Sequence, residues 1–289
     1  RTRAFLKIED GCQNFCTFCI IPYARGPVKS RELSAVAREM KLLTEAGFYE
    51  VVLTGIHLGA YGIDLAARPT LADACRTALA EKSLRRLRLG SLESVELSAD
   101  LLELMRTEPR FAAHLHLPLQ AGSDNVLRAM NRHYNTAAFA HLLEEVRAAV
   151  PGVAISTDII VGFPGETEED FAVGLDFVRQ MGFARMHVFP YSARKGTPAA
   201  RRSDQVPPTV RKERAARMQA LADELAEEYH RAALGSVADV LFETTEDGVT
   251  DGLTETYIRV YTDAPVTRGQ IAPLRLTHLY RDGVWGEMI

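Results

Sequence analysis

Continuous apolar segments alternate with amphipathic segments through most of the chain. Residues 49–55 (YEVVLTG) and 153–162 (VAISTDIIVG) are near-continuous apolar runs, typical of strands buried on both faces. Residues 34–47 and 98–107 repeat apolar positions at helical spacing, and Ser98 is placed to cap the second helix. By the same criteria we expect strands at 5–9, 85–91, 114–120 and 184–192, and helices at 70–80, 123–130, 136–150 and 166–182.

This alternation predicts about six β–α repeats with short connections, which is typical of a parallel sheet covered by helices. Right-handed crossovers would wind such a sheet into a partial (β/α)6 barrel, so the expected fold class is α/β. Polar loops follow the strands, including TGIH, GSLES, QAGSD, GFPGE and YSARKG. Because parallel sheets place their chemistry at the carboxyl ends of the strands, these loops should meet at one mouth.

The last part of the chain has a different pattern. The proline-rich segment QVPP precedes a long charged helix expected at about 209–233. Short β-branched runs separated by DG, GL and RG turns follow Gly235, which predicts a small antiparallel β-barrel. We therefore divide the chain into a core at 1–205, a linking helix at 206–234 that packs on the core, and the small barrel at 235–289.

Composition and charge exclude several classes of protein. Hydrophobic residues make up 47% and charged residues 25% of the chain, so it is globular rather than disordered. A net charge of −4 excludes a general polycation that coats nucleic acid, although a local basic face remains open. No apolar run approaches the ~20 residues needed to cross a bilayer, and the first residues lack a signal-peptide pattern.

Cysteine is the most informative residue type. Cys12, Cys16 and Cys19 lie within eight residues (CQNFCTFC), and Cys75 stands apart on a predicted helix. Three clustered thiols indicate a metal site in a reducing compartment, here the cytoplasm, rather than a disulfide framework. Cys75 is expected to be a small buried helix residue.

The spacing C-x3-C-x2-C suits three irons of a 4Fe–4S cluster. The fourth iron then has no obvious protein ligand in the loop, and an open metal position is typical of a catalytic site. A small molecule with an amine and a carboxylate could chelate that iron. Zinc is the alternative and would need a fourth ligand, for which His57, His114 and His116 are candidates, but the spacing favours the cluster.

This cysteine spacing after the first strand of a β–α barrel resembles radical S-adenosylmethionine (SAM) enzymes. The ordered segments EDGCQNFCTFCIIPYARGPVKSR, VVLTGIHLGAYG, HLPLQAGSDNVLRAMNRHY, TDIIVGFPGETEEDF and FPYSARKGTPAA resemble the methylthiotransferases within that superfamily. The segment LTGIHLGAYG is most similar to the branch that acts on threonylcarbamoyladenosine beside the tRNA anticodon. The terminal segment, with GLTETYIRVY, resembles the TRAM domain, an RNA-binding β-barrel. The resemblance covers essentially the whole chain.

The resemblance implies an activity and its cofactors. A 4Fe–4S cluster with one open iron, held by Cys12, Cys16 and Cys19, would reductively cleave SAM, and the resulting radical would abstract hydrogen from C2 of the adenine. A methylthio group is then added there, with its methyl from a second SAM. Implied partners are tRNA and an electron donor such as a flavodoxin or ferredoxin. Such enzymes carry an N-terminal domain with three further cysteines and a second 4Fe–4S cluster, so we expect this chain to be a piece of a longer enzyme.

Candidate SAM-binding residues follow the strands. In the superfamily, the position of Phe18 packs near the adenine, and a glycine such as Gly55 allows close backbone approach to the SAM amino group. Asp158 lies in an apolar strand, where a carboxylate needs a partner or a ligand hydroxyl. The full set is Phe18, Thr54, Gly55, Gln120, Ser123, Asp158 and Val161, the last in an apolar wall beside adenine. For each, the alternative is an ordinary structural role, such as an N-cap for Ser123 or core packing around Val161.

RNA binding requires local positive charge. The candidates nearest the predicted mouth are Arg25, Lys29, Arg31, Arg194 and Lys195. Residues 235–289 carry 4 basic and 9 acidic residues, so the small barrel would need a restricted patch (Arg259, Arg268 or Arg275) or stacking by Tyr257 and Tyr261. Its alternative role is a packing module.

Other interpretations stay open at this point. From the sequence, the Arg132 side chain could either contact a carboxylate or cap a helix. His114 and His116 share one strand face and are favoured as structural histidines. Alternative functions are methylthiolation of a ribosomal-protein side chain, and a zinc-held RNA-binding module without catalysis.

Overall fold

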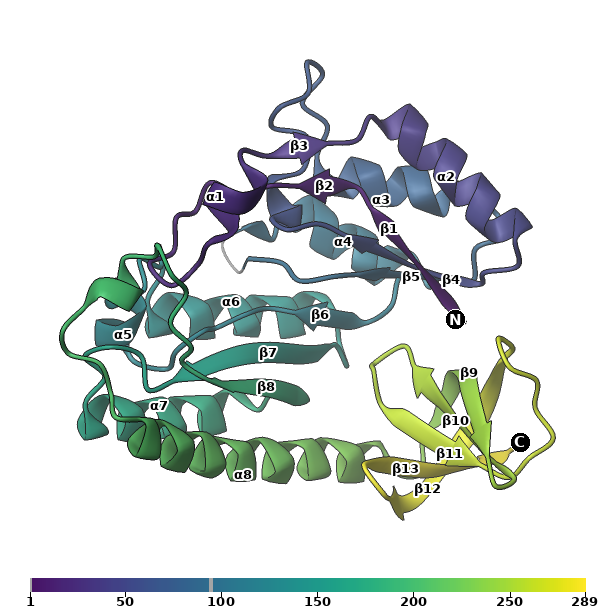
Figure 1. Ribbon diagram of the computed structural model, residues 1–289. Coiled ribbons are helices and arrows are strands. Elements are labelled where there is room, and N and C mark those ends of the chain that lie inside the picture. Colours follow the sequence, from purple (N-terminus) through teal and green to yellow (C-terminus); the bar gives the residue numbers. More distant parts are fainter. Residues whose placement is uncertain (1, 94–95) are drawn as a thin grey trace.

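Six parallel strands form the core of the computed structural model, which describes residues 2–93 and 96–289 (Figure 1). Their order along the chain is also their order in space: β1 (Arg3–Lys7), β4 (Glu50–Thr54) and β5 (Arg86–Leu89), then β6 (His114–His116), β7 (Ala154–Val161) and β8 (Arg185–Pro190). Isolated parallel bridges, Leu87 with Phe111 and Ser91 with His116, join the two groups of three. The expected partial barrel is confirmed.

Amphipathic helices separate the strands and bury their apolar stripes against them. They are α2 (Leu33–Glu45), α3 (Leu71–Leu79), α4 (Ala99–Thr107), α5 (Asp124–Ala129), α6 (Thr136–Ala149) and α7 (Glu168–Met181). Ser98 caps α4 as expected, because its hydroxyl accepts a hydrogen bond from Leu101 N. Thr70 and Thr167 form capping boxes at α3 and α7. Cys75 is fully buried in α3, as predicted for a small helix residue.

Two predicted strands end earlier than expected. Beyond Lys7 the chain leaves the sheet, and β2 (Glu9–Asp10) pairs antiparallel with β3 (Lys29–Ser30), which brackets the cysteine segment and the short helix α1 (Ile21–Arg25). The strand expected at 114–120 stops at His116, because Pro118 lacks an N–H for the ladder and Gln120 takes a positive φ of 69°. Both departures put irregular backbone at the carboxyl end of the barrel.

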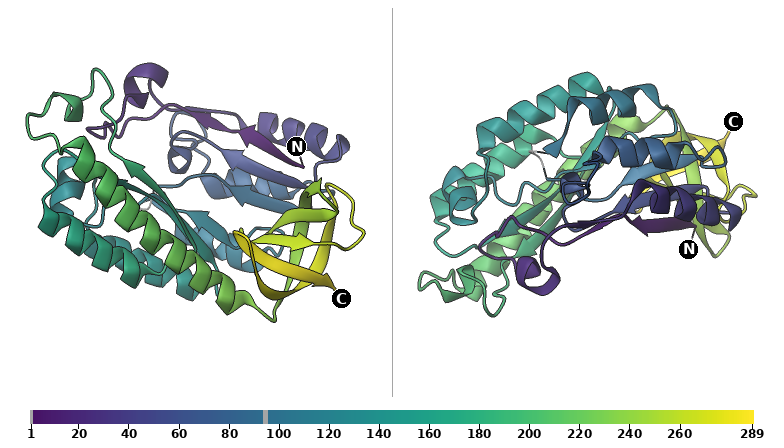
Figure 2. Two further views of the ribbon diagram at one scale, coloured as in Figure 1. Left: turned by 60° about the horizontal axis from the view of Figure 1, so that its bottom comes forward. Right: turned by 90° about the horizontal axis from the view of Figure 1, so that it is seen from above.

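A long helix, α8 (Pro208–Ala233), runs along β8 and α7 toward the C-terminus (Figure 2). It buries Met218, Leu221, Ala222 and Leu225 in the same apolar core as the strands. The helix is therefore an outer layer of the core as well as the connection to the next unit. Among the described residues, no helix combines the length and the apolar character that a membrane span requires.

The C-terminal residues form a closed five-stranded barrel with its own apolar core around Val240, Phe242 and Leu274. Its strands are β9 (Val237–Glu246), β10 (Val249–Thr254), β11 (Arg259–Thr262), β12 (Ile271–Tyr280) and β13 (Gly283–Met288). The expected small β-barrel is confirmed, and four of its five pairings are antiparallel, but β11 and β13 run parallel. Directions cannot alternate around a closed ring with an odd number of strands, so at least one neighbouring pair must be parallel.

This small barrel sits at the amino ends of β1, β4 and β5. Arg86 donates to the carbonyls of Leu253 and Asp239, and Arg88 to those of Thr254 and Glu255. Glu50 lies beneath both arginines at 3.0 and 3.1 Å. Burial alone would raise the pKa of Glu50, but the surrounding guanidinium groups outweigh it and hold that pKa below its ordinary value. The two units are thus joined by a buried ionic network.

Tyr257 has a structural role at the same junction. Its ring stacks on His114 with 4.7 Å between centroids, and the Arg88 guanidinium lies 4.8 Å from its centre. Both contacts come from the core, so the partly buried ring of Tyr257 links the small barrel to the core; its stacking on RNA stays a prediction from the sequence. Tyr261 is buried, with its hydroxyl bonded to Asp282.

Candidate functional site: the cysteine loop and the barrel interior

Cys12, Cys16 and Cys19 lie on one loop at the carboxyl end of the barrel, and all three are free thiols of intermediate burial. Gly11 begins the loop at φ 92°, where a Cβ would lie 2.1 Å from the Pro27 carbonyl oxygen. Only glycine fits this crossing, after which Cys12 N donates to the Gly26 carbonyl at 3.0 Å. The two ends of the loop are therefore held together next to Gly11, and the three cysteines lie on the segment between them.

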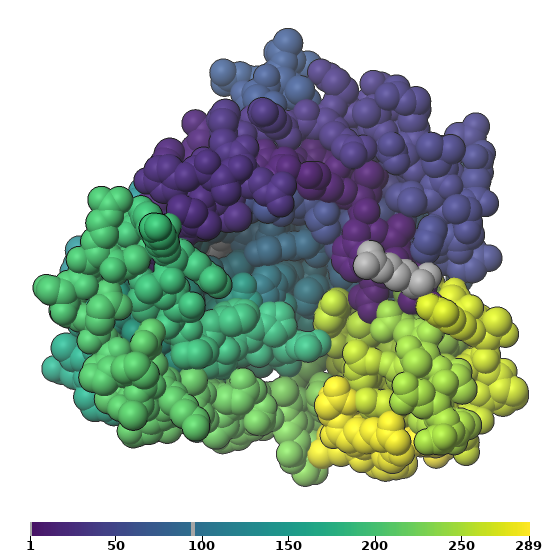
Figure 3. Space-filling model, viewed as in Figure 1, coloured from purple at the N-terminus to yellow at the C-terminus, as the bar shows by residue number. Residues whose placement is uncertain are grey.

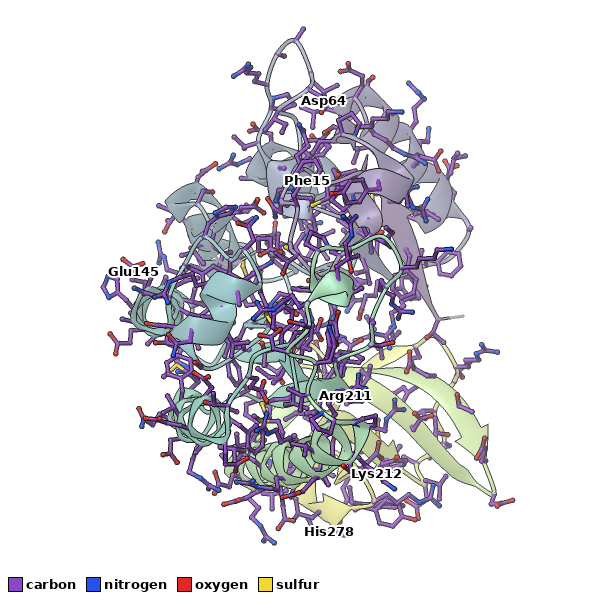
Figure 4. All side chains as sticks on the ribbon, turned by 60° about the vertical axis from the view of Figure 1, so that its left-hand side comes forward. Phe15, Asp64, Glu145, Arg211, Lys212 and His278 are labelled. Atoms are coloured by element: carbon purple, nitrogen blue, oxygen red, sulfur yellow. The ribbon has the colours of Figure 1, made fainter. Side chains whose placement is uncertain are left out.

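Two separate segments support this loop. Thr17 donates from N to the Met130 carbonyl (3.0 Å) and from its hydroxyl to that of Ala129 (2.8 Å), at the end of α5. Ala199 N donates to the Thr17 carbonyl at 2.9 Å, which ties in the segment after β8. Phe15, half exposed, lies at the end of the core away from the small barrel (Figure 4). These bonds fix the backbone that carries the thiols before any metal binds.

Arg132 supplies positive charge to the loop. Its Nη1 donates to Cys16 Sγ at 3.2 Å, Nη2 pairs with Glu93, and Nε donates to the Tyr134 hydroxyl at 3.1 Å. Burial raises the pKa of Cys16 more than the Arg132 contact lowers it, so the isolated thiol holds its proton. A thiolate at this position is the form that binds metal. The structure resolves the two sequence options for Arg132 in favour of side-chain contacts.

Of the three candidate histidines, His57 is the one beside the cysteines. Its backbone N donates to Glu9 Oε2 at 2.7 Å, its Nε2 lies 3.2 Å from Asn14 Nδ2, and its ring pairs with Glu96. Burial alone would lower the pKa of His57, but Cys12 and Glu96 outweigh it and raise that pKa to about 10. The Nε2 atom of His57 is thus engaged by Glu96 and Asn14, while its buried Nδ1 has no hydrogen-bond partner among the described residues.

His114 and His116 instead bind the Ser156 hydroxyl from two sides, at 3.0 and 2.9 Å. His116 and His187 also flank Asp158, with nitrogen–oxygen distances of 3.2 and 3.0 Å. Burial would raise the pKa of Asp158, but the two histidines outweigh it and lower that pKa. These histidines therefore belong to an internal network and do not supply a fourth ligand to the cysteines.

The donor set of the cysteine loop fits an iron–sulfur cluster better than a single ion. A tetrahedral zinc with Zn–S bonds of ~2.3 Å needs ligand atoms roughly 4 Å apart. Within residues 2–93 and 96–289, the set of three donors whose atoms all lie within 4.8 Å of one another is His116, Asp158 and His187, not the three thiols. Three thiolates spread on one loop suit the corners of a cubane, and thiolate is the ligand such clusters prefer.

The expected SAM residues fall into two groups. Thr54, Gly55 and Gln120 lie at the carboxyl ends of strands: a Cβ on Gly55 would meet Glu9 Oε2 at 2.5 Å, and Gln120 at positive φ bonds through its backbone to β7. Phe18, next to Cys19, packs edge-to-face on Phe163 at 6.4 Å.

The second group has internal partners. Ser123 occupies the N-cap position of α5, but its hydroxyl makes no cap bond and donates instead to Asp170 Oδ1 at 2.7 Å. Val161 is buried in the main core, and Asp158 is held by its two histidines. The structure therefore assigns each of these side chains a partner within the protein.

The candidate RNA-binding residues lie around the loop. Arg25 pairs with Asp10 and Arg31 with Glu39, each at 3.6 Å, and Lys29 is exposed on β3. Arg194 and Lys195 are exposed after β8, where Gly196 lies next to Ile20 of the cysteine loop. In the space-filling view, the N-terminal loop and the segment after β8 flank a central hollow of the molecule (Figure 3).

Two neighbouring spaces share part of their lining, one inside the core and one beside the small barrel. The interior cavity, about 270 Å³, is bordered by Thr54, Gly90 and His116; the lateral groove, about 490 Å³, lies between β8, α8 and the small barrel. Arg185, His187 and Tyr257 border both spaces. Sequence reasoning missed Arg185, His187 and Phe189, although their alternation in ARMHVFP placed them on one strand face.

Comparison with known proteins agrees with this geometry. The model of the radical SAM superfamily matches residues 6–178. Threonylcarbamoyladenosine tRNA methylthiotransferase MtaB of Bacillus subtilis is 42% identical over 265 residues, which are 90% of this chain and 59% of that protein. A tRNA-2-methylthio-N(6)-dimethylallyladenosine synthase of Acidothermus cellulolyticus is 43% identical over 238 residues, or 82% and 48%. The chain spans about half the length of these curated relatives.

Solved structures share the fold at low identity. Coproporphyrinogen III oxidase of Escherichia coli, itself a radical SAM enzyme, aligns with 88% of this chain and 66% of its own at a TM-score of 0.54 and 17% identity. The methyltransferase TsrM of Kitasatospora setae aligns with 68% of this chain and 36% of its own at 0.55 and 18%. With three free thiols at the mouth of a six-stranded partial barrel and a family match across most of that barrel, the chain belongs to the radical SAM superfamily.

Proposed function

We propose that this chain is the radical SAM core and C-terminal barrel of a tRNA methylthiotransferase, which adds a methylthio group to C2 of threonylcarbamoyladenosine beside the anticodon. The observation that carries the proposal is the loop of three free thiols, with no fourth cysteine among its described neighbours, at the mouth of a barrel. Its closest functional support is the similarity to relatives that act on modified tRNA adenosines.

Cys12, Cys16 and Cys19 would hold a 4Fe–4S cluster and leave one iron for the amine and carboxylate of SAM. When bound, this pair of cofactors supplies one-electron cleavage of SAM to a 5′-deoxyadenosyl radical. The protein's own contribution is to fix the thiols, offset their charge with Arg132, and hold polar backbone at Gly55 and Gln120 near the mouth. The electron would come from a donor of the flavodoxin or ferredoxin class.

The sulfur that is transferred needs a separate source. We propose a second 4Fe–4S cluster for this role, held by a part of the protein outside this chain. Cys75 cannot contribute to it from its fully buried position in α3. The proposal for the second cluster therefore rests on the family resemblance.

Choice of substrate rests on the segment at residues 53–62 (LTGIHLGAYG), because relatives named for dimethylallyladenosine are about as similar as the one named for threonylcarbamoyladenosine. For the tRNA itself, Arg25, Lys29, Arg31, Arg194 and Lys195 are proposed as phosphate contacts around the mouth.

Mass spectrometry of tRNA nucleosides tests the proposal. A strain that lacks the gene should lose the methylthio form of threonylcarbamoyladenosine and accumulate the unthiolated nucleoside. Complementation with the gene should restore it, whereas a Cys16→Ala version should not. Unchanged methylthio-threonylcarbamoyladenosine in the deletion strain would contradict the proposal, and loss of a methylthio group from a ribosomal protein would assign the other branch.

A further inference from the structure

The inner face of β8 presents a strip of three side chains: Arg185 and His187 border both the cavity and the groove, and Phe189 borders the groove. Arg185, His187 and Phe189 alternate along the strand and are all exposed, while Met186 between them is buried. Phe189 is 49% exposed, which is high for a phenylalanine. The His187 and Phe189 rings lie 6.5 Å apart, centroid to centroid. Exposed rings in a concave site are surfaces on which an unstacked nucleobase packs.

Arg185 forms no salt bridge with the described residues, although Asp223 and Asp282 border the same groove at longer range. The neighbouring Arg88 is paired with Glu50, and Arg259 with Asp251. No carboxylate of residues 2–93 or 96–289 lies within 4.0 Å of the Arg185 guanidinium nitrogens. Its nearest recorded partner is the Tyr257 ring, with 5.9 Å between guanidinium carbon and centroid. An arginine that borders both spaces without a salt bridge of its own is suited to bind an anionic group of a ligand.

The one carboxylate on the facing strand is already engaged. Asp158 accepts from His187 Nδ1 at 3.0 Å and lies 3.2 Å from His116 Nε2. It therefore orients the two imidazoles and leaves Arg185 for a ligand. The strip thus combines an aromatic end toward the mouth with a cationic end toward the small barrel.

The spacing of the strip matches a purine with a charged arm. At a rise of about 3.3 Å per residue, Arg185 lies about 7 Å from His187 and about 13 Å from Phe189 along the strand. A threonylcarbamoyl arm on N6 carries its carboxylate about 6 Å beyond the purine edge, given bonds of roughly 1.3–1.5 Å. A base packed near His187 and Phe189 would therefore bring that carboxylate within reach of Arg185.

We propose that Arg185 binds the carboxylate of the threonylcarbamoyl group and is the residue that selects a charged adenosine arm over an apolar one. An uncharged dimethylallyl arm in the same place would leave the guanidinium without a partner and displace its water. This inference rests on the proposed function, since it requires that a modified adenosine enters the barrel.

Binding of anticodon stem-loop RNA to the anaerobically reconstituted chain tests the inference. Three fluorescent stem-loops are compared by anisotropy: one with threonylcarbamoyladenosine, one with its methyl ester, and one with dimethylallyladenosine. The unaltered protein should bind the acid at least about tenfold more tightly than the ester, as expected for a charge-assisted hydrogen bond. Arg185→Gln should remove this preference, and Arg185→Lys should retain part of it.

Matched controls separate this result from a general loss of charge or of folding. Arg38→Gln, at an exposed position on α2, should leave the acid-to-ester ratio unchanged. Iron content and the thermal midpoint of Arg185→Gln should equal those of the unaltered protein. Equal affinity of the unaltered protein for acid and ester, or a preference that survives in a folded Arg185→Gln, overturns the inference alone. Failure to bind any of the three RNAs overturns it together with the proposed substrate.

Discussion

Arg132 donates a hydrogen bond to Cys16 Sγ at 3.2 Å while the same guanidinium pairs with Glu93. This contact places a fixed positive charge against one of the three sulfurs proposed to hold the cluster. The Arg132 guanidinium also neutralises the Glu93 carboxylate, so the electric field at the Cys16 sulfur depends mainly on Arg132. Hydrogen bonds and charge near cluster sulfurs set the reduction potential.

Arg132→Gln should lower the midpoint potential of the reconstituted cluster. The substitution removes the charge and leaves Glu93 unpaired nearby, and both effects disfavour an added electron. A fall of some tens of millivolts is expected, since 59 mV corresponds to 1.4 kcal/mol for one electron. Electron paramagnetic resonance during a redox titration measures it. Arg128→Gln, on the exposed side of α5, is the control and should not shift the potential; an unshifted Arg132→Gln midpoint would show that the contact is absent in the loaded protein.

His57→Ala distinguishes the cluster from the zinc alternative. His57 is the histidine nearest the thiols, so a zinc site would use it as the fourth ligand. We expect His57→Ala to retain about four irons per chain after anaerobic reconstitution, while Cys12→Ala loses most of them. Metal analysis by mass spectrometry measures the iron and zinc content of both variants. Loss of one equivalent of zinc from His57→Ala, with no iron in either protein, would support the alternative.

Glu50→Gln should destabilise the chain strongly. Its carboxylate is fully buried and faces Arg86, Arg88 and, at 3.8 Å, Arg3. Removing one partner of such a buried network leaves uncompensated guanidinium charge and costs about 3–5 kcal/mol. Urea denaturation measures the change, and Glu103→Gln, in an exposed pair with Arg106, should have little effect on stability. Equal effects of the two substitutions would contradict the account of the junction.

The same carboxylate predicts the direction of the acid sensitivity. Because the folded-state pKa of Glu50 is lowered, its contribution to the free energy of unfolding is present above the unfolded pKa of about 4.5. That contribution is lost as pH falls through the folded pKa. The difference in stability between the unaltered chain and Glu50→Gln should therefore shrink on acidification below pH ~4.5 and stay constant above it. If the stability difference between the two proteins instead grew toward low pH, the pKa of Glu50 would be raised in the folded state rather than lowered.

Tyr257→Ala should weaken the attachment of the small barrel. The ring stacks on His114 and lies over Arg88, contacts worth about 1–3 kcal/mol together with the buried area. Tyr257→Phe keeps the ring and should stay close to the unaltered chain, and Tyr23→Ala, at an exposed position on α1, is the control. Limited proteolysis of the segment between α8 and β9 would report the loosened junction; equal protection in Tyr257→Ala would show that the ring does not hold the two units together.

Periodicity predicted the strands and helices of the core because those elements bury continuous apolar faces. It failed where a single residue decides the backbone: Pro118 ends β6 early, and Gly11 at positive φ turns the chain into the cysteine loop. It also could not predict the parallel pair β11–β13, which follows from closure of a ring rather than from local pattern.

The cysteines of the candidate site were predictable because their ligand spacing is local in sequence. Contacts between residues that lie far apart in the sequence could not be predicted in this way. Nothing in the sequence near Ser123 indicates that its hydroxyl binds Asp170, and nothing near Tyr257 indicates that its ring faces His114. The Arg185 strip lay within reach of sequence reasoning through its alternation, but its unpaired charge is visible only when the surrounding side chains are placed.

The central claim is that Cys12, Cys16 and Cys19 hold a cluster whose free iron binds SAM, and formation of 5′-deoxyadenosine tests it most directly. After anaerobic reconstitution and reduction with dithionite, the chain should contain about four irons and release 5′-deoxyadenosine from SAM. Cys16→Ala should abolish the product, while Cys75→Ala, a small change in the buried face of α3, should retain it. A reconstituted chain that holds one zinc and forms no 5′-deoxyadenosine, or a Cys16→Ala protein that still forms it, would contradict the claim.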